Sequence, residues 1–376
     1  GYAADQALAP QLDGVDVIIG GDSHTLLGPD SMKGFGLTPA GAYPTAATDK
    51  AGRPVCIAQA WQYAYAVGAL DVSFDAAGQV ARCSGTPQVL VGEAFKVGNV
   101  VAAAADADAF RSQLAASGVF RITTPSTTAT AALAPFKAAK DALSTQVAGV
   151  ATDNLCLRRV PGTKRDVTRS SLGDVCNKDA TVIAQGGDIQ QLVADAFLEQ
   201  GQRFGGADIS LQNAGGVRID IPAGDITVGK VYTLLPFKNT LYRLQLTGAQ
   251  VRAALEDGID SVLNGTGSGA YPYTGGLRFS VDMNQARGSR IGNPEVRDAG
   301  GNWQPLDPAA SYRLITNNFT ADGGDKYDTF KAIPAAQRED TFLDYADSFL
   351  QYVRSRSPLA KPATAARSTQ SYIETP

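Results

Sequence analysis

Three short stretches of this 376-residue chain carry residue types that can bind a small charged ligand. Each stretch sets a flat or charged side chain beside glycine or amide residues, which let a ligand approach the backbone closely. The stretches are Gln212-Asn213-Ala214-Gly215-Gly216-Val217-Arg218, Leu235-Pro236-Phe237-Lys238-Asn239-Thr240-Leu241 and Thr316-Asn317-Asn318-Phe319-Thr320-Ala321-Asp322-Gly323-Gly324-Asp325. Together they predict a pocket for a nucleotide.

Each part of a nucleotide has a candidate partner in these stretches. Arg218 offers a planar fork of donors that matches a phosphate or a carboxylate. Phe237 and Phe319 offer two apolar faces, and stacking a base on an aromatic ring is worth roughly 1–3 kcal/mol. Asp325 can accept two hydroxyl hydrogen bonds, as a ribose diol requires.

Two asparagines extend this set. The amides of Asn213 and Asn239 both donate and accept, which suits base edges and sugar hydroxyls. Taken singly, these residues also have simpler explanations, because a phenylalanine in an apolar run is usually core and a Gly-Gly-Asp usually forms a turn. Only the three stretches together favour the binding interpretation.

In their order, the stretches resemble the C-terminal, nucleotide-binding domain of the 5′-nucleotidase family of metallophosphatases. The resemblance runs from about residue 208 to 327 and includes Ala223–Gly229 and Leu246–Gly248. In that family two phenylalanines hold the base between them, an aspartate binds ribose, and asparagine and arginines hold sugar and phosphate. The resemblance implies substrate-binding roles for Arg158, Arg159, Asn213, Gly215, Arg218, Phe237, Asn239, Gly276, Phe319 and Asp325.

Two members of that set, Arg158 and Arg159, are included because of their position in the chain. Family members carry one or two phosphate-binding arginines just before a helix, which is expected here at about Asp188–Leu198. The arginines lie in an extended polar loop, residues 158–169, that follows Cys156. Each charged residue of this loop can instead be a solvated surface charge.

Near the start of the chain, Val15–Ile19 reads as a buried strand of parallel type that runs into a glycine turn. The turn carries Asp22 and His24, where the family has Gly-His-Ser-His with two metal-binding histidines. His24 matches the second histidine, and Asp22 stands in the place of the first. A carboxylate can bind Mn²⁺, Mg²⁺ or Zn²⁺, but the exchange alters affinity and metal preference.

The histidine content argues against a complete metal centre, because His24 is the only histidine. A dinuclear phosphatase centre needs several ligands around metals about 3.5–4 Å apart, and the family's Asp-x-His and Gly-Asn-His-Glu-type motifs are absent. We therefore expect the C-terminal part of a longer enzyme that holds two divalent ions of Zn, Mn or Mg type. This chain without the missing N-terminal segment should bind metal weakly or not at all, and should hydrolyse little. The alternative is that His24 is a former metal ligand that has lost its partner ligands.

The composition restricts the classes of protein to which this chain can belong. With 44% hydrophobic and 19% charged residues, the chain can bury more than one core. The net charge of −4 argues against a nucleic-acid surface, which needs clustered Lys and Arg. No apolar run reaches the roughly 18 residues that a membrane span requires.

The four cysteines suggest two local pairs, Cys56 with Cys83 and Cys156 with Cys176. Local pairing of an even count favours an oxidising compartment, so we expect a periplasmic or secreted protein. Reduced, buried cysteines are the alternative.

The order of elements predicts an α/β protein, with a mixed α/β (α+β) arrangement in its C-terminal domain. An alanine-rich stretch, Ala129–Val150, carries Leu133, Phe136 and Leu143 at helical spacing, which indicates an amphipathic linker helix. The expected divisions are the end of a metallophosphatase sandwich at 1–123, a linker helix and hinge at 124–150, the substrate-binding domain at 151–360 and a disordered tail at 361–376.

These observations favour the nucleotide-binding part of a metal-dependent 5′-nucleotidase-type phosphohydrolase. The resemblance admits nucleoside 5′-monophosphates, UDP-sugars, NAD and cyclic nucleotides as substrates. The alternative is a non-catalytic extracellular module or pseudoenzyme that captures nucleotides without cleaving them.

Overall fold

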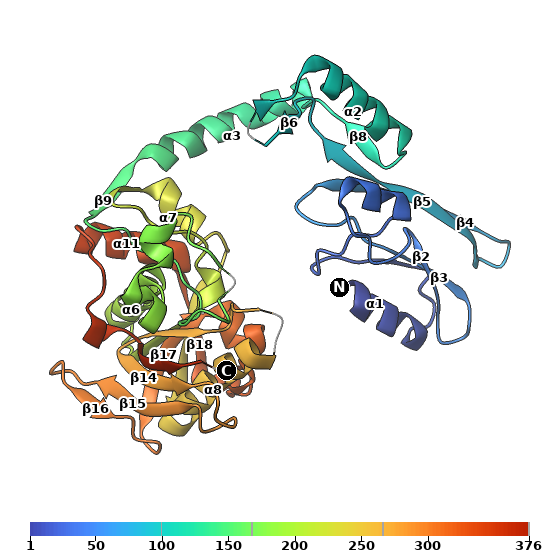
Figure 1. Cartoon of the computed structure of the whole chain (residues 1–376). Coiled ribbons are helices and arrows are strands. Elements are labelled where there is room, and N and C mark those ends of the chain that lie inside the picture. Colours follow the sequence, from blue (N-terminus) through green and yellow to red (C-terminus); the bar gives the residue numbers. More distant parts are fainter. Residues whose placement is uncertain (99, 167, 265–266, 375–376) are drawn as a thin grey trace. The chain divides into compact units, whose positions relative to one another are not determined.

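The computed structural model describes residues 1–98, 100–166, 168–264 and 267–374. The chain divides into two compact units, Gly1–Ala134 and Pro135–Pro376 (Figure 1). The division falls inside helix α3, Thr127–Thr145. Each unit has its own sheets and its own buried residues, so each is described by itself.

The first unit is built on two small sheets, with strand orders β1-β3-β2 and β4-β5-β8, and a ribbon of β6 and β7. Its strands are β1 Val17–Ile19, β2 Thr45–Thr48, β3 Pro54–Ala58, β4 Ala66–Phe74, β5 Val80–Val91, β6 Lys96–Val97, β7 Val100–Val101 and β8 Phe120–Ile122. Its helices are α1 Tyr2–Leu8 and α2 Ala104–Ala116, with 3₁₀ turns η1 Ala9–Gln11 and η2 Asp30–Phe35.

The strand expected at Val15–Ile19 is present as β1, which pairs in parallel with β3. The strand is not fully buried, however, because Ile19 is 70% exposed. In the same unit, β4 and β5 pair along their length in antiparallel fashion.

Helix α3 occupies the segment expected to form an amphipathic linker. Its apolar side chains Leu133, Phe136 and Leu143 are exposed, and none of its residues is buried. The helical spacing of apolar residues therefore predicted the helix correctly, but these side chains do not pack into the core of either unit.

The second unit contains a five-stranded sheet of order β13-β10-β17-β12-β18, a four-stranded sheet of order β16-β15-β14-β19 and a ribbon of β11 and β9. Its strands are β9 Val147–Ala151, β10 Ile209–Asn213, β11 Gly224–Thr227, β12 Thr240–Thr247, β13 Pro272–Gly275, β14 Leu277–Asp282, β15 Ile291–Arg297, β16 Trp303–Pro305, β17 Ser311–Asn317, β18 Arg338–Asp344 and β19 Thr369–Ile373. Its α-helices are α4 Asp174–Asn177, α5 Ala180–Gln185, α6 Asp188–Arg203, α7 Val228–Leu234, α8 Gly248–Asn264, α9 Asn318–Ala321, α10 Asp328–Lys331 and α11 Tyr345–Arg356. Its 3₁₀ turns are η3 Ala214–Gly216, η4 Gly324–Lys326, η5 Ala335–Gln337 and η6 Thr364–Ala366.

The five-stranded sheet separates two hydrophobic cores. Successive side chains of a strand point to opposite faces of the sheet, and Leu314 and Ile315 of β17 accordingly belong to different cores. Helix α8 packs in the first core, and α6 with α11 packs in the second. The expected helix at 188–198 is α6, and its start lies beside the loop that carries Arg158 and Arg159.

At the C-terminal end the structure differs from the expected disordered tail. Residues 369–373 form strand β19, which pairs in parallel with β14. Arg367, just before the strand, is 1% exposed and forms an ion pair with Asp188. The Ala-, Pro- and Ser-rich composition suggested disorder, but a backbone ladder and a buried ion pair hold this segment against the unit.

Both predicted cysteine pairs are present as disulfides, Cys56–Cys83 and Cys156–Cys176. The first joins β3 to β5, and the second ties Cys156 to helix α4. Among the described residues, no helix has the length and apolar character to cross a membrane.

Candidate functional site

All three chemistry-bearing stretches of the sequence meet at one cavity of about 350 Å³ in the second unit. The cavity lies where the chain leaves strands β10 and β17 and enters β12. Its walls are Arg159, Asn213, Gly215, Gly216, Arg218, Phe237, Asn239, Gly269, Phe319 and Asp325. Eight of these residues were predicted from the sequence, and Gly216 lies within a predicted stretch.

Phe319 reaches the cavity because a helix begins immediately after β17. The side-chain Oδ1 of Asn317 accepts a hydrogen bond from Thr320 N at 3.0 Å and caps α9, the helix that carries Phe319. The ring lies against Gly324, where an added Cβ would come within 2.6 Å of ring atoms. Glycine at this position therefore lets the aromatic ring lie on the backbone.

Asp325 follows in a tight turn and has left-handed backbone geometry, with φ of 55°. Aspartate tolerates this region better than most residues with a Cβ. Asn213 Nδ2 donates to Asp325 Oδ2 at 2.7 Å, and Asn317 Nδ2 donates to Asn213 Oδ1 at 3.0 Å. Because Asn317 is fully buried, this chain of amides fixes the carboxylate at the cavity wall.

Phe237 lies on the loop between α7 and β12. Tyr345 Oη accepts a hydrogen bond from Phe237 N at 2.9 Å, which fixes the loop backbone. Arg218 contacts the ring, with its guanidinium carbon 5.7 Å from the ring centroid, and its Nη1 donates to Gly215 O at 3.1 Å. Phe237 and Phe319 are both 46% exposed, which is unusual for core phenylalanines and leaves ring surface open to a ligand.

Two glycines bring backbone segments together at the cavity wall. Gly215 N donates to Gly269 O at 2.8 Å, and a Cβ on Gly215 would lie 3.0 Å from Gly269 Cα. At this part of the wall the two backbone segments therefore lie against each other with no side chain between them. Gly269 escaped the sequence analysis, although the Gly267-Ser268-Gly269 run could have drawn attention to it.

The charges around the cavity are incompletely compensated. Burial and the neighbouring guanidinium of Arg218 lower the pKa of Arg159, while Asp166 and Asp325 oppose that effect. Among the residues that the structure describes, the buried Nε of Arg159 has no hydrogen-bond partner. Burial raises the pKa of Asp325, against the hydrogen bond from Asn213 and the charge of Arg159. An anion between Arg159 and Arg218 would relieve the repulsion between two nearby cations.

Arg158 does not line the cavity, contrary to the expectation from the resemblance. Its side chain is 5% exposed, and its Nη1 donates to Gly162 O at 2.6 Å. The guanidinium also lies 3.7 Å from Asp166 Oδ2. Successive residues of an extended segment point in opposite directions. Arg159 therefore faces the cavity while Arg158 is turned into the loop that carries both.

Gly276 also lies outside the cavity and lines a different one, with Asp195 and Trp303. Its φ of 71° is left-handed, and an added Cβ would come within 2.7 Å of Asp208 O. This glycine is needed for the tight passage from β13 to β14. The position beside the cavity is held by Gly269 instead.

In the first unit, Asp22 and His24 lie in the exposed turn after β1, both with positive φ. The ring of His24 makes an edge contact with Tyr63, with centroids 4.6 Å apart. Among residues 1–98, 100–166, 168–264 and 267–374, no group of three or more His, Cys, Asp or Glu side chains is arranged to hold a metal. Asp22 and His24 therefore offer two donors without a third.

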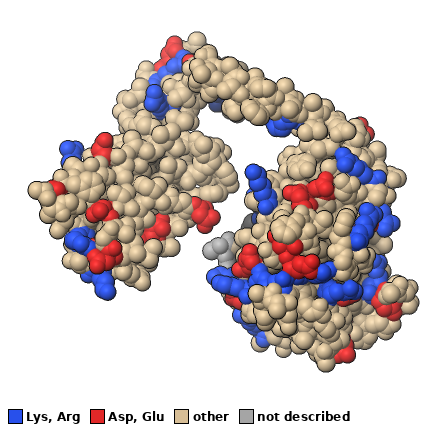
Figure 2. All heavy atoms as spheres, turned by 180° about the vertical axis from the view of Figure 1, so that it is seen from behind, with Lys and Arg blue, Asp and Glu red and all other residues tan. Residues whose placement is uncertain are grey.

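On the face shown in Figure 2, basic and acidic side chains are interspersed over the surface. The two arginines at the cavity, Arg159 and Arg218, come from separate loops. Such an arrangement suits a small anion held in a pocket.

The chain is also similar in sequence to known proteins. Residues 166–332 match the family described as "5′-nucleotidase, C-terminal domain". The chain is 32% identical over 365 residues to a probable 5′-nucleotidase of Treponema pallidum, covering 94% of this chain and 59% of that protein. It is 29% identical over 358 residues to the NAD 5′-nucleotidase of Haemophilus influenzae, covering 92% of this chain and 57% of that protein.

A solved structure gives the same result. The crystal structure of a 5′-nucleotidase precursor from Thermus thermophilus aligns with a TM-score of 0.53 and 32% identity, covering 100% of this chain and 63% of that one. The chain thus spans less than two thirds of each of these three proteins. Together, the matched domain, the relatives and the shared fold show that the chain carries a 5′-nucleotidase C-terminal domain and is similar to 5′-nucleotidases along nearly its whole length.

Proposed function

We propose that this chain supplies the nucleotide-binding part of a 5′-nucleotidase-type phosphohydrolase. The observation that carries the proposal is one cavity in which two half-exposed phenylalanines, a half-buried carboxylate and two arginines meet. Its volume of about 350 Å³ lies in the range of small-molecule pockets. The similarity to 5′-nucleotidases independently favours nucleotide hydrolysis as the activity of the whole protein.

In this proposal the base stacks between Phe237 and Phe319. Both rings keep open surface, and each is fixed from behind, Phe237 through the bond from its backbone to Tyr345 and Phe319 through the cap on α9. Rings already held in place lose little conformational entropy when a base binds. Asn239 at the same wall offers a donor and an acceptor to the base edge or the sugar.

The ribose is assigned to Asp325. Asn213 occupies one lone-pair direction of Oδ2, and no other described side chain donates to the carboxylate, so its other oxygen can accept from a hydroxyl. The backbone turn at Gly215 and Gly269 leaves room for the sugar beside this carboxylate, since a Cβ on Gly269 would lie 3.6 Å from Asp325 Oδ2.

The phosphate is assigned to Arg159 and Arg218. Both guanidiniums line the cavity, and burial together with the charge of Arg218 lowers the pKa of Arg159, so a bound anion would stabilise the cationic form of Arg159. A bidentate arginine contact fits a phosphate group in geometry and charge. The shared base, ribose and phosphate of nucleoside monophosphates, UDP-sugars, NAD and cyclic nucleotides are the parts that this cavity would address.

Hydrolysis in the whole protein is proposed to depend on divalent metal ions of Zn, Mn or Mg type. The residues of this chain do not fit a dinuclear centre, because Asp22 and His24 are exposed and lack a third donor among the described residues. Ligands from a further N-terminal metallophosphatase segment would have to complete it. We therefore assign recognition to this chain and expect it to release little or no phosphate when alone.

The two disulfides fit an oxidising compartment, and we propose a periplasmic or secreted location. Peptide mapping of protein taken from its native compartment, without reduction, should recover both linked pairs. Four free thiols would contradict this location.

A calorimetric titration with adenosine tests the proposed function. The parent chain should bind one adenosine, and a variant with both Phe237→Ala and Phe319→Ala should show no saturable heat. The matched control is Phe342→Ala, which removes an 83% exposed phenylalanine outside the cavity. Adenosine binding that survives loss of both rings would overturn the assignment of the pocket.

A further inference from the structure

The C-terminal residues are linked to the loop that carries Arg159 at two separate places. We call residues 359–374 the C-terminal strap and residues 156–166 the arginine loop. At the base of the arginine loop the link runs through Asp188, and at its tip the strap contacts the loop directly. The strap therefore touches the part of the chain that presents a cation to the cavity.

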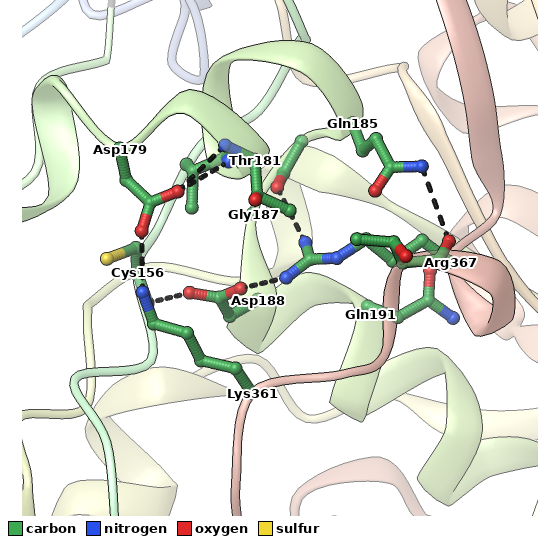
Figure 3. A network of polar contacts seen from close by, with 12 residues as sticks. Cys156, Asp179, Thr181, Gln185, Gly187, Asp188, Gln191, Lys361 and Arg367 are labelled. Atoms are coloured by element: carbon green, nitrogen blue, oxygen red, sulfur yellow. Dashed lines mark hydrogen bonds and ion pairs between the residues drawn. The ribbon is translucent and has the colours of Figure 1, made fainter.

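At the base, a buried ion pair joins the strap to the start of α6 (Figure 3). Arg367 of the strap pairs with Asp188, and its Nη1 donates to Gly186 O at 3.0 Å. The other carboxylate oxygen of Asp188 accepts from Cys156 N at 3.0 Å, so one aspartate links the strap to the first residue of the arginine loop. Arg367 and Asp188 are almost fully buried, and this contact serves the fold of the whole unit.

At the tip, the carboxylate of Glu374 binds backbone amides of the arginine loop. Its Oε1 accepts from Thr163 N and, at 2.8 Å, from Lys164 N. Thr163 Oγ1 donates to Oε2 at 3.3 Å. Gly162 has a left-handed φ of 85°, and an added Cβ would collide with the carboxylate. The backbone at the tip of the loop thus fits closely around the carboxylate of Glu374.

Glu374 is held in place by the sheet behind it. Strand β19 ends one residue earlier, at Ile373, whose carbonyl accepts from Met283 N at 3.0 Å. The carbonyl of Glu374 accepts from Asn284 Nδ2 at 3.2 Å. The carboxylate of Glu374 therefore ties the tip of the arginine loop, which contains no helix or strand, to the four-stranded sheet.

Inside the arginine loop, the contacts of Arg158 connect the tip with the backbone next to Arg159. The guanidinium of Arg158 binds Gly162 O, next to the residues that Glu374 holds, and lies near Asp166. Tyr273 Oη donates to Arg158 O at 2.6 Å, which fixes the backbone just before Arg159. Arg159 is left as the residue of this network that lines the cavity.

We propose that Glu374 is a positioning residue for the anion-binding side of the cavity. It holds the tip of the arginine loop against the sheet, so that Arg159 faces the bound phosphate. This inference rests on the proposed nucleotide function. It gives the strap a role in selecting ligands that carry a phosphate over ligands that do not.

The test compares AMP with adenosine in calorimetric titrations of the full chain. Glu374→Ala should weaken AMP binding about fivefold, the equivalent of about 1 kcal/mol for one ordinary hydrogen bond, and should leave adenosine binding unchanged. Glu374→Gln keeps a carbonyl acceptor for the loop amides and should recover most of the AMP affinity. Ser371→Ala, an exposed position on the same strand, is the matched control and should change neither ligand.

The outcomes separate the inference from the function on which it rests. A parent chain that binds neither ligand removes the nucleotide function and the inference with it. A parent that binds both, with an unchanged ratio of AMP to adenosine affinity in Glu374→Ala, removes the positioning role alone. Equal weakening of both ligands would show that Glu374 only stabilises the fold, and would also overturn the proposal.

Discussion

Two regions of this chain carry residues suited to chemistry, and they are organised in opposite ways. The cavity of the second unit collects side chains from distant parts of the sequence, such as Asn213 and Asp325, which are joined by a 2.7 Å hydrogen bond. The turn after β1 in the first unit carries Asp22 and His24, neighbours in sequence that remain exposed. One region is assembled by the fold, and the other is a local turn.

The difference shows how recognition and hydrolysis can be separated in one family. In the proposed function, base, ribose and phosphate are bound by groups that converge on one cavity of the second unit. A dinuclear metal centre needs several ligands at one point, and the described residues of the first unit supply two donors. Nucleotide affinity and phosphate release should therefore respond to different substitutions.

The largest effect on the cavity is expected from Arg218→Ala. This change removes a cation assigned to the phosphate and exposes one face of Phe237, so AMP should bind about thirtyfold more weakly, equivalent to about 2 kcal/mol for a charged hydrogen bond. Calorimetry measures the effect. The control Lys230→Ala removes a cation that binds Asp225 O outside the cavity and should leave AMP affinity unchanged. Equal AMP affinity in Arg218→Ala and parent would contradict the phosphate assignment.

A smaller effect is expected from Phe319→Ala. Loss of one stacking partner should weaken adenosine binding about tenfold, within the roughly 1–3 kcal/mol of a stacked base, and should leave inorganic phosphate binding unchanged. Competition titrations with both ligands distinguish the two contributions. If adenosine bound equally well to the variant, the ring would belong to the packing of η4 and not to the ligand site.

Asp325→Asn should have a more selective effect. Replacing a carboxylate oxygen with a donor removes one acceptor, so adenosine should bind about fivefold more weakly, the worth of one hydrogen bond. 2′,3′-Dideoxyadenosine lacks the diol and should bind parent and variant equally. Asp322→Asn, at an acid that pairs with Arg338, serves as control. A loss of the same size for both nucleosides would argue against a ribose contact.

The smallest effect is a dependence of adenosine binding on pH. Burial raises the pKa of Asp325, so this carboxyl takes up a proton at higher pH than an ordinary aspartate. Protonation removes acceptor capacity, so adenosine affinity should fall as pH is lowered toward the range in which an ordinary aspartate titrates, and the fall should begin above that range. Affinity in Asp325→Asn should vary less over the same range. Parallel pH profiles for both proteins would assign the titration to another group.

Sequence reasoning identified most of the cavity because ligand-binding motifs are local even when the pocket is not. Phe237, Phe319 and Asp325 each stand beside glycine or amide residues, and these patterns can be recognised in the sequence without knowledge of the fold. The motifs did not show in which direction each side chain points. Arg158 and Arg159 are adjacent and chemically equal, and only the course of the loop turns one inward to Gly162 and the other to the cavity.

Glycines were harder to interpret for the same reason. Gly276 has a left-handed φ that a turn between strands requires, whereas Gly269 lies against Gly215 across the cavity wall. Both roles demand glycine, and composition does not distinguish them. The C-terminal segment is a similar case, since the buried pairing of Arg367 with Asp188 depends on residues far apart in the chain.

Titration of AMP into the metal-free chain in the presence of EDTA tests the central claim most directly. We predict saturable binding of one AMP by the parent, with the same affinity in a variant that carries both Asp22→Ala and His24→Ala. Absence of binding without metal, or its loss in that variant, would show that the exposed turn takes part in recognition and would contradict a complete nucleotide pocket in the second unit.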